Sequence, residues 1–287
     1  MRVLMVHKTR KGGVAIHVKE ISRELRKRGI KVDEITRNED IKSRNFFESY
    51  AKMKKLFSRW SKEYDIIHCH DWSITYPALK SNIKNLVATF HALPTNPIAS
   101  FFENYCIKNL SYRAVVISPK MKRVYKEATL IPNGVNLSIF KKYKNIKRVK
   151  NLVGLAQRYN LRKIISAVKK SGFDFVHTQN KMKYEELGKF YSKIEIFISI
   201  PYEAAGFNMV WLEAMASEVP YIIGTNAGIG EILPIYKIRD FDGLRNILSK
   251  IKNEEIKPLK NQRRWIIKNK LTWEEHVKKL IEVYNEI

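Results

Sequence analysis

Short apolar runs alternate with helical patterns along this chain, and this alternation restricts its fold more than any other feature. The first apolar run, 3–7, precedes a Gly-Gly break and a segment with apolar residues on one helical face. Further strands are expected at 31–36, 64–71, 85–92, 113–118 and 128–135. Apolar runs of this length between helices are typical of strands in a parallel sheet with both faces covered. The first half is therefore predicted to be a doubly wound α/β domain.

The same alternation begins again after a polar, lysine-rich stretch at 141–150. Strands are expected at 151–155, 173–178, 195–200 and 221–225, with helices at 162–172, 182–193, 257–270 and 272–286. The fold class is therefore α/β, with two Rossmann-like, doubly wound domains. We place the first domain at 1–142 and the second at 143–270.

The chain carries a formal charge of +26, from 54 Lys and Arg against 28 Asp and Glu. This balance favours an anionic partner, such as a nucleotide, a phosphate-bearing substrate, nucleic acid or an acidic membrane surface. A lysine-rich composition set by genome bias or a hot habitat explains the charge equally well. The two cysteines lack the spacing of a metal site, which points to a reducing cytoplasm. The sequence contains no run of 18 apolar residues, so no membrane span is predicted.

Two turns carry residues suited to binding anions. Gly12 and Gly13 lie between the first strand and its helix, where backbone amides favour an anion, although a plain glycine turn is the alternative. The sequence there matches neither GxGxxG nor GxxxxGK. Arg158, Arg162 and Lys163 follow the first strand of the second half. Cations there suit a diphosphate leaving group, and a basic solvated surface is the alternative.

Histidines follow two neighbouring strands of the first half. His68 and His70 lie on one face of a predicted strand, and His91 ends the next one. A metal site would need further ligands and a closed geometry. We favour the other interpretation, in which these groups line the carboxyl edge of the sheet, where open α/β folds bind ligands.

Two further segments have competing interpretations. Asp240-Phe-Asp242 has the DxD form of some metal-dependent sugar transferases, but it precedes an amphipathic helix, so we favour helix capping. The basic, apolar segment 52–60 fits either a helix at a membrane interface or an ordinary helix packed on the sheet, and we favour the second.

The stretch PYEAAGFNMVWLEAMA, 201–216, combines a turn at Gly206, Phe207 and Asn208 with an apolar helix that carries Glu213. A carboxylate there can accept hydrogen bonds from two ribose hydroxyls, while amides at the helix start can meet phosphate. The alternative is a Glu213 side chain that faces solvent, which its apolar neighbours disfavour.

Seven stretches together resemble the retaining, nucleotide-sugar-dependent glycosyltransferases of family 4, which have the GT-B fold. They occur in family order over nearly the whole chain: GGVAIHVKEISRELRKRG, DIIHCHDW, ATFHA, LIPNGVN, GFNMVWLEAMASEVPYIIG, NAGIGEIL and LTWEEHVKKLIEVYNEI. The resemblance implies two domains that face a cleft, with the acceptor mainly on the first and the donor on the second. It also implies that the last helix, 271–287, crosses back to the first domain.

The resemblance implies roles for single residues. Glu213 matches the glutamate that holds the ribose, Gly13 lies near the donor phosphates, and His91 contacts the transferred sugar. Arg158 and Lys163 match the pair that neutralises the diphosphate. Ala205 stands at the family's first glutamate position, so either Glu203, two residues before it, substitutes for that glutamate or the donor sugar loses that contact.

We therefore expect transfer of a sugar, with retention, from a UDP- or GDP-sugar to a hydroxyl of a glycan, lipid or protein glycan. No metal or other cofactor is required, because arginine and lysine neutralise the leaving group. The expected location is cytoplasmic, with an anionic membrane surface as a further partner. The alternatives are a catalytically silent GT-B scaffold, supported by Ala205, and a basic nucleic-acid-binding protein, for which the sequence shows no motif.

Overall fold

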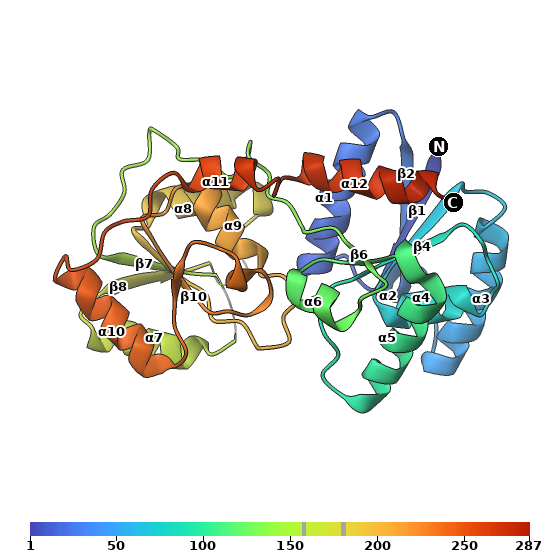
Figure 1. Cartoon of the computed structure of the whole chain (residues 1–287), viewed down its shortest axis with the longest axis horizontal. Helices are drawn as coiled ribbons and strands as arrows, with labels where there is room; N and C mark the ends of the chain where they lie inside the picture. Colours follow the sequence, from blue (N-terminus) through green and yellow to red (C-terminus); the bar gives the residue numbers. More distant parts are fainter. Residues whose placement is uncertain (157–158, 179–181) are drawn as a thin grey trace. The chain divides into compact units, whose positions relative to one another are not determined.

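The computed structural model describes residues 1–156, 159–178 and 182–287. Contacts divide the chain into two compact units, which Figure 1 draws with their elements labelled. Unit 1 combines Met1–Asn133 with Trp273–Ile287, and unit 2 is Gly134–Thr272. That residues 1–142, 143–270 and 271–287 form the domains of the chain remains a prediction.

Unit 1 is built on a six-stranded parallel sheet with the strand order β2-β1-β3-β4-β5-β6. Its strands are β1 (Arg2–His7), β2 (Lys31–Thr36), β3 (Ile66–His70), β4 (Leu86–Phe90), β5 (Ala114–Val116) and β6 (Thr129–Leu130). Every residue of β3 and β4 is buried, as the continuous apolar runs predict. The chain changes direction across the sheet between β1 and β3, so the carboxyl ends of these two strands flank the expected ligand position.

Helices cover both faces of this sheet. They are α1 (Gly13–Lys27), α2 (Arg37–Asp40), α3 (Phe46–Trp60), α4 (Trp72–Leu79), α5 (Pro97–Leu110), η1 (Ser111–Arg113), α6 (Pro119–Val124) and α12 (Trp273–Asn285). Met53, Phe57 and Trp60 of α3 are almost fully buried. The apolar face of α3 therefore packs in the fold and is not available to a membrane.

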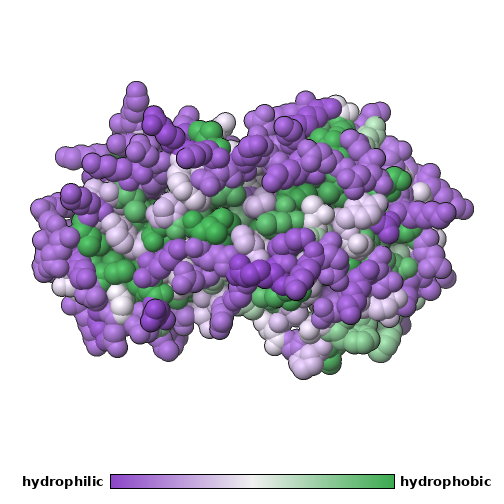
Figure 2. All heavy atoms as spheres, viewed as in Figure 1, coloured by the Kyte–Doolittle hydropathy of each residue, from purple (hydrophilic) through white to green (hydrophobic). Residues whose placement is uncertain are grey.

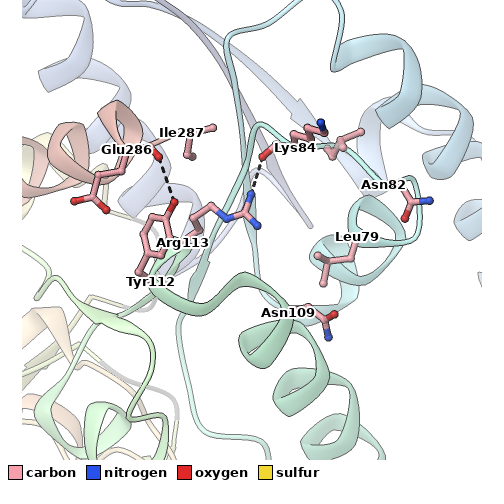
Figure 3. A pocket seen from close by; sticks show the side chains of 9 residues that line it. Leu79, Asn82, Lys84, Asn109, Tyr112, Arg113, Glu286 and Ile287 are labelled. Carbon is pink, nitrogen blue, oxygen red and sulfur yellow. Dashed lines mark hydrogen bonds between the residues drawn. The ribbon is translucent and has the colours of Figure 1, made fainter.

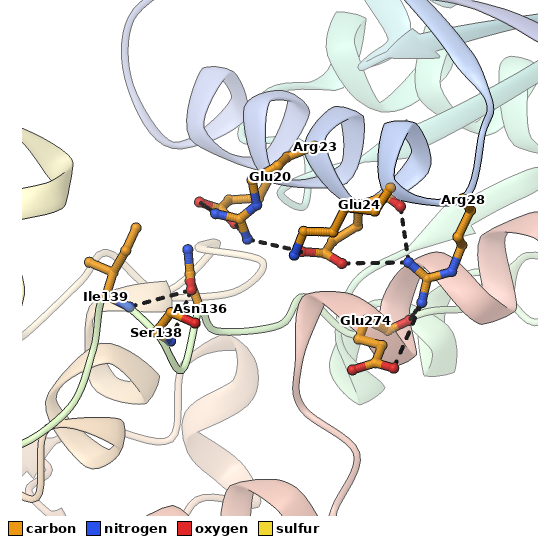
Figure 4. Close-up of polar contacts among 9 residues, drawn as sticks. Glu20, Arg23, Glu24, Arg28, Asn136, Ser138, Ile139 and Glu274 are labelled. Carbon is orange, nitrogen blue, oxygen red and sulfur yellow. Dashed lines mark hydrogen bonds and ion pairs between the residues drawn. The ribbon is translucent and has the colours of Figure 1, made fainter.

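The last helix, α12, belongs to unit 1 and packs against α1, so the expected return of the C-terminus to the first unit is confirmed. In Figure 4 Arg28 of α1 reaches Glu274 of α12, with Nη2 donating to the backbone oxygen at 3.5 Å. The same arginine also approaches Glu24 in its own helix. These polar contacts of Arg28 are partly exposed and contribute little to stability. The main contribution of α12 comes from apolar side chains such as Val277 and Leu280, which are fully buried.

Unit 2 is built on a five-stranded parallel sheet with the order β11-β10-β9-β7-β8. Its strands are β7 (Leu152–Leu155), β8 (Asp174–His177), β9 (Ile196–Ile198), β10 (Tyr221–Gly224) and β11 (Tyr236–Lys237). Its helices are α7 (Leu161–Lys170), η2 (Tyr184–Glu186), α8 (Leu187–Lys193), α9 (Met209–Ala216), η3 (Gly228–Glu231), α10 (Phe241–Lys252) and α11 (Gln262–Lys268). In Figure 1 α7 and α10 cover one face, while α8, α9 and α11 cover the other.

The two parallel sheets confirm the predicted α/β fold class. Asp240 is the N-cap of α10, and its Oδ1 accepts a hydrogen bond from the Gly243 amide at 2.7 Å, so capping is the role that the structure gives to the DxD stretch. Hydrophilic residues cover most of the visible face of each unit in Figure 2. Among the described residues, no helix is both long and apolar enough to cross a membrane.

Candidate active site

Glu213 lies on α9, the helix that follows the turn after β9, and its side chain is only 4% exposed. The carboxylate Oε2 accepts a hydrogen bond from the Tyr191 hydroxyl of α8 at 2.9 Å. Burial, together with this carboxylate, raises the pKa of Tyr191 well above its usual value, so the phenol stays a donor. The interpretation that Glu213 faces solvent is therefore wrong, and the carboxylate is held in a fixed orientation.

The turn before α9 is tied to the end of β9. Gly206 and Phe207 are buried, and Asn208 donates from Nδ2 to the Ser199 hydroxyl at 2.9 Å. Glu203, by contrast, is exposed. The turn therefore presents the first amides of α9 at the carboxyl edge of the sheet, where an anion is favoured.

Gly228 fixes the same turn from the other side. It has φ +53°, and a Cβ on it would lie 2.8 Å from the backbone oxygens of Ala205 and Gly206. An alanine would have to keep a left-handed conformation, which costs about 1–2 kcal/mol, and would also push against the turn.

We expect Gly228→Ala to lower the free energy of unfolding by about 1–3 kcal/mol, from strain and displacement of the turn. Urea denaturation would measure it. Gly243→Ala is the matched control, because a Cβ there meets nothing closer than 3.4 Å and its φ is not positive. Equal stability of the two variants would show that Gly228 does not hold the turn.

Arg162 and Lys163 lie in the first turn of α7, and both are exposed. They line a surface pocket of about 370 Å³ together with Ser166, Ala167, Lys170, Phe241 and Arg245. The Lys163 ammonium lies 5.8 Å from the centre of the Phe241 ring. The cations therefore gather between α7 and α10, on the other face of the sheet from α9. Arg158 lies outside the described residues.

In unit 1, Gly12 precedes α1 with φ +87°, and open space surrounds the position of a Cβ. The positive φ explains the glycine at this turn. Gly13 starts α1, and both glycines are exposed. The first amides of α1 are thus accessible at the carboxyl end of β1, which suits an anion and leaves the plain-turn interpretation open.

Six of the seven histidines of the chain gather in unit 1, beside that turn: His7, His17, His68, His70, His91 and His276. His70 Nδ1 and His91 Nε2 share a hydrogen bond of 3.0 Å, so the predicted proximity of these two strand ends is confirmed. The rings of His68 and His70 stack with centres 4.6 Å apart.

Burial lowers the pKa values of five of these histidines, His17, His68, His70, His91 and His276. It lowers the pKa of His68 to about 3, and both nitrogens of that ring are engaged, with the Tyr284 hydroxyl at 2.7 Å and the Thr89 hydroxyl at 2.8 Å. Burial and the neighbouring histidines lower the pKa values of His17 and His70 well below 6.5. Burial also lowers the pKa of His91, although Asp71 opposes this shift.

Several of these partners were not found from the sequence. Tyr191 belongs to another helix than Glu213, and His17 and His276 approach the strand ends from α1 and α12. No local motif marks them. The only signal was that histidines, rare in this chain, recur in several of the stretches that carry the family resemblance.

Another pocket lies elsewhere in unit 1, with a volume of about 520 Å³ (Figure 3). It lies at the amino ends of β4 and β5, where Arg113 donates to the Lys84 backbone oxygen at 2.7 Å and Tyr112 donates to that of Glu286 at 3.2 Å. Ligands of open α/β sheets bind at the carboxyl ends instead. We therefore do not assign the reaction to this pocket.

The chain is similar to known proteins both in sequence and in fold. The family model described as Glycosyltransferase Family 4 matches residues 11–139. A protein of Methanocaldococcus jannaschii, the uncharacterized glycosyltransferase MJ1178, is 25% identical over an alignment of 244 residues that covers 77% of this chain and 67% of that protein.

Two solved structures share the fold over 100% of both chains. One is Anabaena HepE in complex with UDP, with a TM-score of 0.74 and 12% identity. The other is the UDP-GlcNAc 2-epimerase of Neisseria meningitidis bound to UDP-GlcNAc, with a TM-score of 0.64 and 13% identity. At these identities the likeness shows the fold alone.

Proposed function

We propose that this chain, a glycosyltransferase of the family 4 type with the GT-B fold, moves a sugar from a UDP- or GDP-sugar to an acceptor hydroxyl with retention. The single observation that carries the donor assignment is the buried carboxylate of Glu213 on α9, oriented by the Tyr191 hydroxyl. Structural neighbours with UDP or UDP-GlcNAc bound support a nucleotide-sugar donor.

In the proposed complex, Glu213 accepts hydrogen bonds from the two ribose hydroxyls. Such bonds to a charged acceptor each contribute about 1.5–3 kcal/mol. The turn of Gly206, Phe207 and Asn208 directs the first amides of α9 toward the donor phosphates. Gly12 and Gly13 supply further amides from unit 1, and His91 contacts the transferred sugar.

The reaction breaks the bond between the anomeric carbon and the diphosphate oxygen and forms a bond from the acceptor oxygen on the same face of the sugar. The departing phosphate oxygen takes the acceptor's proton. Lys163, Arg162 and Arg158 neutralise the charge that develops on the diphosphate, which is the largest contribution to catalysis. This step uses no metal ion. Because Ala205 stands at the position of the family's first glutamate, Glu203 is the carboxylate that contacts the donor sugar in this proposal.

The acceptor in this proposal is a glycan or a lipid-linked sugar at the cytoplasmic face of an anionic membrane. The high positive charge supports electrostatic attraction to such a surface. On α5, Ile98 and Phe101 expose 69% and 66% of their surface. Large exposed apolar side chains at one helix start suit contact with lipid.

Turnover with UDP-, GDP- and ADP-sugars, with and without an acceptor, tests this function. We expect one donor to release nucleoside diphosphate in an acceptor-dependent way, at a rate unchanged when Mg²⁺ and Mn²⁺ are omitted. Proton NMR of the product should show the anomeric configuration of the donor.

Other outcomes select other functions. Binding of a nucleotide sugar without turnover would identify a silent scaffold. Conversion of the free nucleotide sugar without an acceptor would identify an epimerase. Retention on DNA that is salt-dependent and insensitive to nucleotide sugars would identify a nucleic-acid-binding protein.

A further inference from the structure

Three of the clustered histidines offer nitrogen atoms close enough to share one ion. His17 comes from α1, His70 from the end of β3 and His91 from the residue after β4. One ligand nitrogen from each lies within 4.8 Å of the other two. Zinc–nitrogen bonds of about 2.0–2.1 Å in a tetrahedral site place ligand nitrogens about 3.3 Å apart. Small rotations of the three rings would therefore bring them to bonding distance.

Two of these rings hold a nitrogen that has no hydrogen-bond partner among the described residues. They are Nε2 of His17 and Nε2 of His70, in side chains that are 0% exposed. A buried polar atom without a hydrogen-bond partner is costly. The rings of His17 and His70 lie with their centres 5.4 Å apart, so one bound group could satisfy both atoms.

The tautomer of His17 leaves a lone pair that can bind either a cation or a hydrogen-bond donor. Its Nδ1 lies 3.0 Å from the Oδ1 of Asn133, which can only accept, so Nδ1 carries the hydrogen and donates it. Nε2 is then a bare lone pair. Metal-bound histidines are commonly oriented in this way, by donating the other ring N–H to a carbonyl or carboxylate oxygen.

We propose that His17, His70 and His91 bind one divalent transition-metal ion of the zinc type in unit 1. Imidazole nitrogens suit zinc, copper, nickel and iron, whereas Mg²⁺ and Ca²⁺ prefer oxygen ligands. Three protein ligands leave a position open, which a water molecule would fill on the side of half-buried His91.

The surrounding contacts explain why these three histidines are the ligands. His68 stacks on His70 but uses both ring nitrogens in hydrogen bonds. His276 donates from Nδ1 to the Pro132 oxygen at 2.8 Å; its Nε2 also lacks a partner among the described residues, but it does not belong to the group of three. Asp71 accepts a hydrogen bond from the His91 amide at 3.2 Å and supplies nearby negative charge.

The ion would join α1 to the carboxyl ends of β3 and β4, and it would fix the ring of His91. It does not contact the diphosphate in the proposed transfer step, so the inference does not rest on the proposed function. The hydrogen bond between His70 and His91 would be replaced by bonds from both rings to the ion.

The metal content of the purified chain, prepared without a histidine tag, tests the site. After removal of metals, the protein is loaded with Zn²⁺ or Co²⁺, passed through gel filtration and analysed by mass spectrometry. We expect one ion per chain, and for Co²⁺ the intense visible absorption of a four-coordinate site. His17→Ala and His70→Ala should retain less than a tenth as much.

Two variants separate coordination from folding. His177→Ala, on β8 of unit 2, should bind as the wild type does. Asn133→Ala keeps all three ligands but loses the partner of His17, so its affinity should fall about 10- to 100-fold. Zinc should raise the melting temperature of the wild type and not of the two ligand variants. The proposal would be overturned if the wild-type protein retained no ion after gel filtration, or if its Co²⁺ form had the weak visible absorption of an octahedral site. Both results come from the wild type and so do not depend on how the variants fold.

Discussion

Replacing Glu213 by glutamine is expected to lower kcat/KM for the nucleotide-sugar donor about 100-fold. Glutamine keeps the shape of the side chain and can still accept a hydrogen bond from Tyr191. It loses the charge and presents an NH₂ group to one ribose hydroxyl. A loss of about 3 kcal/mol from two charge-assisted hydrogen bonds corresponds to two powers of ten in rate. Steady-state kinetics with varied donor and saturating acceptor would measure it.

Tyr191→Phe is the matched control for this experiment. It removes the hydroxyl that orients Glu213 at 2.9 Å but leaves the carboxylate in place. We expect a loss of less than about tenfold, since a neutral hydrogen bond contributes about 0.5–1.5 kcal/mol net. If Glu213→Gln had wild-type kinetics while folding normally, Glu213 would not bind the donor.

Glu103→Gln is expected to stabilise the protein by about 4 kcal/mol at pH 8 and to have little effect at pH 4.5. Glu103 lies on α5, is 3% exposed and accepts a hydrogen bond from the Tyr125 hydroxyl at 2.8 Å. Burial raises the pKa of Glu103 from 4.5 to about 8, despite the opposing effect of Tyr125. The folded protein therefore holds a proton that the unfolded chain releases.

The sign follows from proton linkage. Between pH 4.5 and 8 the folded state binds more protons at Glu103 than the unfolded state, so stability falls as the pH rises. Each pH unit in that window costs about 1.4 kcal/mol, until the folded carboxyl itself ionises. Glutamine carries no titratable proton, and this contribution disappears.

Urea denaturation of wild type and Glu103→Gln from pH 4.5 to 8 would measure the difference. Glu254→Gln changes an exposed residue on the surface of unit 2 and is the control, so its stability should follow that of the wild type across this pH range. Parallel stability curves for wild type and Glu103→Gln across this range would show that Glu103 is ionised in the folded protein.

Most of the parallel strands were predictable because they are short, largely apolar runs, which lose most when left exposed. The sequence did not predict the shorter or interrupted elements. The helix α4 contains Pro77, which hides its periodicity, and the two residues of β11 form a strand only through pairing with β10. The start of α5 did carry a signal, since Asn96 caps it before Pro97.

The site was predictable where one short segment carries it. Glu213 follows its turn within a few residues, and burial of its apolar neighbours follows from composition. The histidine cluster was only partly predictable, because His17 and His276 reach it through the packing of α1 and α12 on the sheet edge. The sequence predicts that Lys163 and Arg162 neutralise a diphosphate. It does not predict their pocket with Phe241, which depends on α10 packing beside α7.

Calorimetric titration of the chain with UDP, GDP and ADP tests the central claim most directly. The account predicts that one of the three binds at one site per chain, and that Glu213→Gln weakens this binding while Gly243→Ala does not. Absence of binding by all three nucleotides to the folded wild-type protein at millimolar concentration would contradict it.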